Sequence, residues 1–218
     1  MKSVRKPVSV SFGPKYSERL SKSELLSLLR SDLRGATNDQ KDPPRPSLKG
    51  RELSPRGRVI NLVVLHVSDT KPSQNFTLNS LAACHKARGF GEYIGYHFYI
   101  RRDGTLYYTR PVYLKGCHVA GHNANSIGIC SEGGHRNDDM VTYSSFAGGS
   151  PPKRGSEERV HEDNRTAEQM IVLHELLTTL HSLIPDAKLC GHHDLNPGKA
   201  CPCMDPPAAV EYAYIFNS

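Results

Sequence analysis

An apolar stretch decides the fold class: residues 59–67 read VINLVVLHV. In an extended chain its side chains are apolar on both faces, and a histidine, His66, stands next to its end. Such strands are typical of the interior of a sheet that is covered on both sides. We therefore expect residues 59–67 to form a central strand, with the rest of the chain supplying its neighbours and its cover.

The residues that follow supply both strands and helices. Thr77 can cap one helix, and Thr166 can cap a second, longer one. Asp103 and Gly104 form a strong signal for a hairpin turn between two strands. The expected elements are helices at 78–88 and 167–183, and strands at 96–101, 105–110, 126–130 and 188–190. This mixture predicts an α/β fold, with a single mixed central β-sheet flanked by helices.

The first 57 residues differ from the rest in composition. Residues 21–24 have the spacing of a helix capping box, and leucines follow at helical spacing, so a short helix is expected at about 22–34. A linker rich in proline and charge comes next. We expect a basic N-terminal extension at 1–57 and the principal domain at 58–218.

Charge separates these two parts. Residues 1–58 hold 14 Lys+Arg against 6 Asp+Glu, which gives +8, and the remaining residues give −2. A basic arm of this kind can bind anionic envelope polymers, or it can be a solvated tail. Nucleic acid is the less favoured partner, because only two aromatic residues are interleaved with the basic ones.

The densest group of metal-binding residue types lies at residues 190–203, which read CGHHDLNPGKACPC. A Pro-Gly pair stands between His192 and Cys201, so the loop can fold back and place both side chains on one ion. The alternative is a set of unrelated polar loop residues. His66 is the third candidate, because a catalytic zinc has three protein ligands and one position open to water. These residues predict one Zn²⁺ in a His2Cys site.

Four stretches of the chain carry distinctive motifs. They read LHVSDTKPSQN at 65–75, IGYHFYIRRDGTLYYTR at 94–110, HVAGHNANSIGICSEGG at 118–134 and GHHDLNPGKACP at 191–202. These stretches resemble the type 2 N-acetylmuramoyl-L-alanine amidases, particularly their phage-lysozyme branch, and more distantly the peptidoglycan recognition proteins. They keep the order of the family and cover about residues 59–205. Together they are far more specific than any one of them alone.

The resemblance implies a role for five residues. His66, His192 and Cys201 would be the zinc ligands, and Tyr96 and Lys199 would be the catalytic residues. The implied reaction is hydrolysis of the amide bond between N-acetylmuramic acid and L-alanine in bacterial peptidoglycan. Zinc would activate water and polarise the carbonyl. Lys199 could stabilise the oxyanion, and Tyr96 could donate a hydrogen bond or move a proton.

The chain departs from the family pattern in two places. Some members carry a glutamate where this chain has Cys130, and Glu132, expected on the same side of the strand, is an alternative base. Residues 1–57 and 135–165 have no clear counterpart in the family. The second of these stretches reads as a long polar loop, of a kind that is often functional.

The resemblance favours a phage-type endolysin, which accumulates in the host cytoplasm before its release to the cell wall. We expect no membrane span, because no apolar run approaches roughly 18 residues, and no Sec-type signal peptide, because no apolar segment follows the basic N-terminus. A secreted antibacterial amidase is one alternative. The other is a peptidoglycan-binding recognition module without activity, which typically lacks the cysteine present here as Cys201. Peptidoglycan is the expected partner, and nothing demands more than a monomer.

Overall fold

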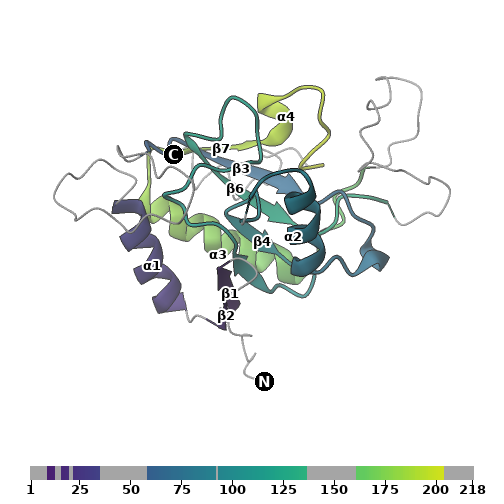
Figure 1. Ribbon diagram of the computed structural model, residues 1–218, viewed down its shortest axis with the longest axis horizontal. Coiled ribbons are helices and arrows are strands. Elements are labelled where there is room, and N and C mark those ends of the chain that lie inside the picture. The colour runs from purple at the N-terminus through teal and green to yellow at the C-terminus, as the bar shows by residue number, and fades with distance from the viewer. Residues whose placement is uncertain are drawn as a thin grey trace.

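A five-stranded sheet forms the centre of the molecule, in a computed structural model that describes residues 9–12, 16–19, 22–34, 58–91, 93–136 and 161–203. Its order is β5-β4-β6-β3-β7 (Figure 1). The strands are β3 (Leu62–Val67), β4 (Phe98–Ile100), β5 (Leu106–Tyr108), β6 (Ser126–Ser131) and β7 (Lys188–Gly191). β3 runs parallel to β6 and β7, β4 runs parallel to β6, and β5 is the antiparallel partner of β4. The predicted mixed central sheet is confirmed.

β3 lies inside the sheet because it is apolar on both faces. Val63 and Val64 point to opposite faces, and both are 0% exposed. Leu65 pairs with Ile129 of β6 on one side and with Gly191 of β7 on the other. The predicted central strand is therefore confirmed, although it begins at Leu62 rather than at residue 59.

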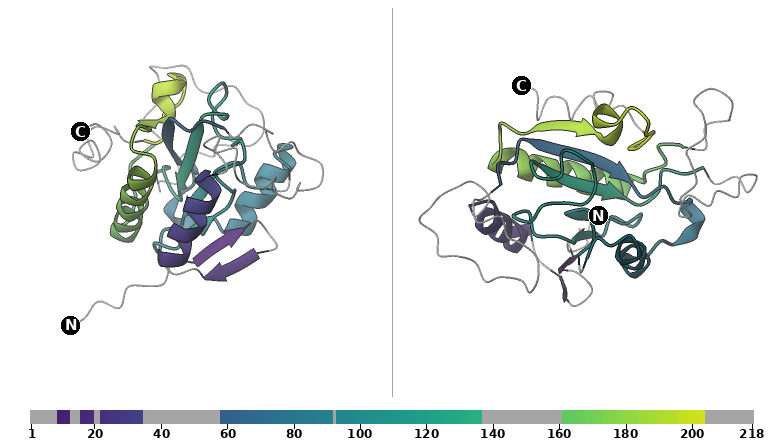
Figure 2. Two further views of the ribbon diagram at one scale, coloured as in Figure 1. Left: turned by 90° about the vertical axis from the view of Figure 1, so that its left-hand side faces the viewer. Right: turned by 45° about the horizontal axis from the view of Figure 1, so that its top comes forward.

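Different helices cover the two faces of the sheet (Figure 2). α1 (Lys22–Arg34) and α3 (Ala167–Leu183) pack on one face, and α2 (Leu78–Ala87) packs on the other. The core under α1 and α3 includes Leu25, Leu29, Val63, Leu65, Phe98, Ile127, Leu173 and Leu177. The smaller core near α2 consists of Leu81, Ile94, Tyr99 and Cys130. The second face is thus less filled with apolar side chains.

α1 belongs to the larger core although it lies within the basic extension. Leu29 is 0% exposed, and the buried leucines repeat at one-turn spacing along one side of the helix. On the same side the carboxylate of Asp32 accepts a 2.7 Å hydrogen bond from the hydroxyl of Tyr108 in β5. α1 is therefore attached to the sheet by apolar packing and by the buried hydrogen bond between Asp32 and Tyr108.

Two short strands were not predicted. β1 (Ser9–Phe12) and β2 (Tyr16–Arg19) form a separate antiparallel pair, and β1 contacts β5. Their four-residue length gives too little alternation to be read from the sequence. The predicted linker and most of the predicted loop 135–165 lie outside the described residues. Among the helices that are described, none is long and apolar enough to cross a membrane.

Candidate active site

The site lies where neighbouring parallel strands end. His66 stands near the carboxyl end of β3, opposite Cys130 of β6, and it is 2% exposed. β7 ends at Gly191, and His192 begins the short helix α4 (His192–Leu195). Because β3 and β7 are parallel neighbours, their carboxyl ends bring the two histidines to one edge of the sheet.

The loop after α4 folds back to this edge. The amide of His193 donates a 2.8 Å hydrogen bond to the carbonyl of Cys201, which closes the loop. The ring of Pro202 packs against Gly191, where a side-chain carbon would come within 2.6 Å of it. The thiol of Cys201 then accepts a 3.3 Å hydrogen bond from the amide of Val67. Cys201 therefore sits at the end of β3, far away in sequence.

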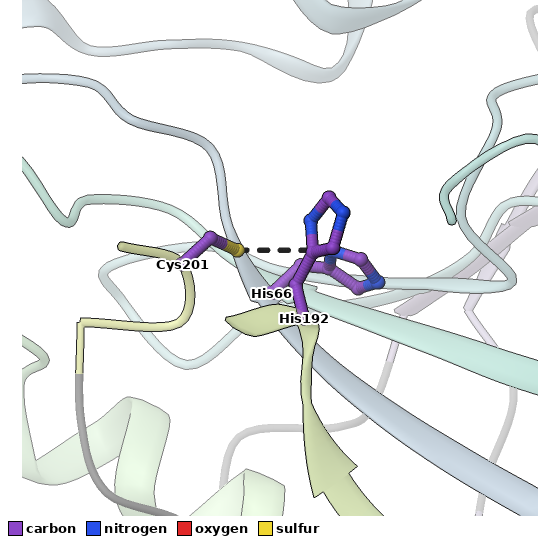
Figure 3. A group of neighbouring side chains, drawn as sticks. All are labelled: His66, His192 and Cys201. Carbon is purple, nitrogen blue, oxygen red and sulfur yellow. Dashed lines mark hydrogen bonds between the residues drawn. The ribbon is translucent and has the colours of Figure 1, made fainter. Parts of the chain in front are cut away.

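Three metal-binding side chains meet here (Figure 3). The ligand atoms of His66, His192 and Cys201 all lie within 4.8 Å of one another. Cys201 Sγ is 3.7 Å from His66 Nδ1. A sulfur and a nitrogen bound to one tetrahedral zinc ion lie roughly 3.6 Å apart, given the usual bond lengths. The donor types and their spacing therefore fit zinc.

The electrostatic environment suits the same ion. Burial lowers the pKa of His66 well below its usual value. Burial and the nearby Lys199 lower the pKa of His192 to about 4. Both rings are therefore neutral near pH 7 and can offer a lone pair. Burial raises the pKa of the Cys201 thiol to about 12, so a cation has to replace its proton before the sulfur can bind as a thiolate.

His118 fixes the ring of His66 from behind. His118 Nδ1 lies 2.9 Å from His66 Nε2, and His118 Nε2 lies 3.3 Å from the hydroxyl of Ser126. That hydroxyl donates to the carbonyl of His122 at 2.7 Å. These contacts assign one proton to Nε2 of each ring, which leaves Nδ1 of His66 facing Cys201. Metal-binding histidines are commonly oriented by such a second hydrogen bond.

Tyr96 and Lys199 lie in the same pocket, which has a volume of about 320 Å³ and is also lined by His192 and Cys201. The Tyr96 ring is half-buried, 5.1 Å from the ring of His66 between centroids. Burial raises the pKa of Tyr96 well above its usual value, so the hydroxyl keeps its proton. Lys199 is exposed on the loop after α4. The structure thus brings together all five residues singled out from the sequence.

Glu132 is not brought to this pocket. One carboxylate oxygen accepts a 2.7 Å hydrogen bond from the amide of Phe76, and the other accepts one of 2.7 Å from Arg101. The residue is 1% exposed. Glu132 therefore ties two loops to the end of β6, and the alternative of Glu132 as a base has no support from its position.

Two features of the site were not predicted. The first is the contact of His118 with His66, since no spacing in the sequence indicates that these two residues meet. The second is a separate cluster of Asp69, His135 and His161. The two histidines stand near the ends of the predicted loop 135–165, and an isolated bridge brings them together in the structure.

Comparison with known proteins gives consistent matches. The family model of N-acetylmuramoyl-L-alanine amidase matches residues 56–204. The chain is 37% identical over 143 residues to the endolysin of Enterobacteria phage T3. This alignment covers 66% of this chain and 80% of that protein.

Solved structures show the same likeness. The N-acetylmuramoyl-L-alanine amidase LysC from Clostridium intestinale URNW is 32% identical, with a TM-score of 0.52, over 72% of this chain and 85% of that one. The Ph2119 endolysin from a Thermus scotoductus bacteriophage shares the fold at 22% identity, with a TM-score of 0.52, over 77% of this chain and 92% of that one.

Proposed function

Since the chain belongs to the N-acetylmuramoyl-L-alanine amidase family, we propose that it hydrolyses the amide bond between N-acetylmuramic acid and L-alanine in bacterial peptidoglycan. One observation carries the proposal. His66, His192 and Cys201 converge within 4.8 Å, beside a pocket that Tyr96 and Lys199 line. Amide hydrolysis needs a polarised carbonyl, an activated water and a group that stabilises negative charge. The residues of this pocket can provide for all three needs.

His66, His192 and Cys201 would hold one zinc ion. A zinc ion bound there supplies a Lewis acid that polarises the carbonyl and lowers the pKa of water to about 7. The protein's own part is to fix the donors before substrate arrives. The amide of Val67 holds the sulfur, and His118 holds the ring of His66. Three protein ligands leave one position for water.

Tyr96 and Lys199 would act on the substrate directly. The protonated hydroxyl of Tyr96 can donate a hydrogen bond to a substrate oxygen inside the pocket. The ammonium group of Lys199 brings a positive charge to the mouth of the same pocket, where it can stabilise the oxyanion that forms as water adds to the carbonyl. Tyr96 would thus approach the scissile amide from the wall of the pocket, and Lys199 would approach it from the rim.

We propose that the protein works as a phage-type endolysin, which is made in the host cytoplasm and later reaches the cell wall. The match to the T3 endolysin over 80% of its length supports this assignment. Residues 1–57 precede nearly all of the family match. Their positive charge would attract anionic envelope polymers, so binding to intact cell walls should weaken as salt is raised.

The proposal is tested by digestion of purified peptidoglycan with the full chain. We expect soluble stem peptides to be released, and the release to stop when a zinc chelator is added and to return when zinc is restored. Cys201→Ser should lower the rate by at least about 100-fold, because the zinc loses one of its three ligands. The matched control is Cys190→Ser, which changes a cysteine of β7 outside the donor cluster.

Two outcomes would contradict the proposal. If Cys201→Ser digests as fast as wild type, this zinc site is not the catalytic centre. If wild type binds zinc and muropeptide but releases no peptide, the chain is a recognition module without activity.

A further inference from the structure

A second cluster of metal-binding side chains lies at the rim of the pocket. Asp69 Oδ1 is 3.1 Å from His135 Nδ1 and 3.2 Å from His161 Nδ1. The ligand atoms of all three lie within 4.8 Å of one another. None of these residues belongs to the group of His66, His192 and Cys201. We propose that Asp69, His135 and His161 form a second metal site, which binds a divalent transition-metal ion such as Zn²⁺.

The spacing of the donors fits a single ion. Two oxygen or nitrogen ligands at about 2.0–2.1 Å from a metal lie roughly 2.9 Å apart in octahedral geometry and roughly 3.3 Å apart in tetrahedral geometry. The observed distances of 3.1 and 3.2 Å fall between these values. Two imidazoles and one carboxylate are a common ligand set for zinc and related ions.

The chemistry of the donors also favours an ion. Both Nδ1 atoms point at the same carboxylate oxygen, so without a cation each ring has to place a proton on that nitrogen. A divalent ion replaces both protons and satisfies all three donors at once. The side chain of Asp69 is 35% exposed, and that of His161 is 36% exposed, which leaves room for water ligands.

The backbone holds the two histidines in place. His135 and His161 face each other across an isolated antiparallel bridge, and their rings stand at 89° with centroids 6.1 Å apart. The side chain of Asn164 donates a 2.7 Å hydrogen bond to the carbonyl of His135 and accepts one of 2.9 Å from the amide of Gly134. These hydrogen bonds to the backbone therefore hold the chain on which His135 stands.

The backbone position next to His135 requires a glycine, Gly134. Its φ of +93° lies in the region that favours glycine, and an added side-chain carbon would collide with Val67 of β3. The chain therefore passes close over β3 immediately before His135. Asp69 follows β3 two residues after Val67, also with a positive φ of 55°.

An ion at this site would link three separate segments. Asp69 lies in the loop after β3, His135 follows β6, and His161 precedes α3. Asp69 and His161 also line the pocket that contains His192 and Lys199. The second ion would thus fix one wall of the pocket without belonging to the His2Cys centre.

The test is a count of bound ions in the full chain. Metal-free protein is dialysed to equilibrium against micromolar Zn²⁺, and bound zinc is measured by mass spectrometry. We expect two ions per chain in wild type and one in His161→Gln. The matched control is His174→Gln, on the far face of the sheet in α3, which should keep both ions.

Cobalt distinguishes the two sites, because only the first contains a thiolate. In His161→Gln the sulfur-to-cobalt absorption band should remain while one cobalt ion is lost; in Cys201→Ser the band should vanish while the second ion remains. Asp69→Asn is the second variant, for use if His161→Gln does not fold. It keeps the shape of the side chain and should also lose one ion. The proposal is overturned if wild type binds a single ion that His161→Gln keeps, or if the count in Asp69→Asn equals that of wild type.

Discussion

Each nitrogen of the His66 ring has its own partner. Nδ1 faces Cys201 at 3.7 Å, and Nε2 faces His118 at 2.9 Å. A metal takes a histidine nitrogen most readily when the other nitrogen is held by a hydrogen bond. At the scale of single residues, the orientation of the His66 ring thus involves His118, which is not itself a candidate ligand.

We expect His118→Ala to lower zinc affinity by about 10–100-fold, as is usual when an outer hydrogen-bond partner of a ligand is lost. The measurement is competition for zinc with a chelator of known affinity. His174→Gln again serves as the control, because it removes a histidine from the opposite face of the sheet. Equal affinities in His118→Ala and wild type would show that His118 does not position His66.

Lys199 is expected to affect the rate without affecting the metal. Lys199→Met keeps a long side chain but removes the charge, and should lower kcat by about 10²–10³-fold, the usual effect of losing one oxyanion-stabilising group. Zinc content should stay at the wild-type value. If zinc is lost along with activity, Lys199 supports the loop of His192 and Cys201 instead of the reaction.

That His192 and Cys201 lie close together could be predicted from the sequence for a physical reason. A short loop with a Pro-Gly pair can bring its own ends together, so His192 and Cys201 are local partners. His118 could not be predicted in this way. Its place depends on Gly128 of β6, where a side-chain carbon would come within 2.7 Å of the His118 ring. The space that Gly128 leaves for the His118 ring exists only when the strands are in place, so the sequence alone does not show it.

At the scale of elements, predictability follows the strength of the local pattern. The structure has α3 at Ala167–Leu183, in agreement with the prediction at both ends. Its start is well defined because Thr166 accepts a hydrogen bond from the amide of Gln169 and so caps the helix. β1 and β2 lack such signals. Each is four residues long, and their pairing depends on contacts made in the folded chain.

The helix of the basic extension provides a prediction at this scale. Leu29→Ala in α1 should lower the free energy of unfolding by about 2–5 kcal/mol, since Leu29 is fully buried against the sheet. Ser27→Ala, at an exposed position of the same helix, should change it by less than about 0.5 kcal/mol. Denaturation in urea measures both. If both substitutions change the free energy of unfolding by equally small amounts, α1 is not packed on the core in solution.

At the scale of the whole molecule, buried neutral histidines predict sensitivity to acid. His85 is 5% exposed, and burial, with Arg88 and Arg110 nearby, lowers its pKa to about 4. Its Nδ1 accepts a 2.8 Å hydrogen bond from the amide of Gly95. The unfolded chain, in which a histidine has a pKa of about 6.5, therefore takes up a proton first as the pH falls. The stability contributed by this group is present above about pH 6.5 and is lost from there down towards pH 4.

Between pH 7 and pH 5, His85 should account for about 2 kcal/mol of lost unfolding free energy. His85→Gln keeps an acceptor for the amide of Gly95 but does not titrate. In urea denaturation with a chelator present, the variant should therefore lose about 2 kcal/mol less than wild type over this range. An identical loss in both proteins would show that His85 does not contribute to the acid sensitivity.

The candidate site lies at one edge of the sheet, where β3, β6 and β7 end. The larger core, under α1 and α3, lies on one face of the sheet, and the smaller core, near α2, lies on the other. The pocket contains residues of the smaller core, such as Leu81, together with His192 and Cys201. The fold thus keeps a polar pocket beside three candidate metal ligands on the face that apolar side chains fill less.

The most direct measurement of the central claim identifies the bond that is cut. Purified peptidoglycan is digested with the full chain, and the products are labelled separately at new amino termini and at new reducing sugar ends. The proposed activity predicts new amino termini that are L-alanine, with glycan strands left intact. New reducing ends without free L-alanine amino termini would mean that the chain cuts sugar linkages, and would contradict the account.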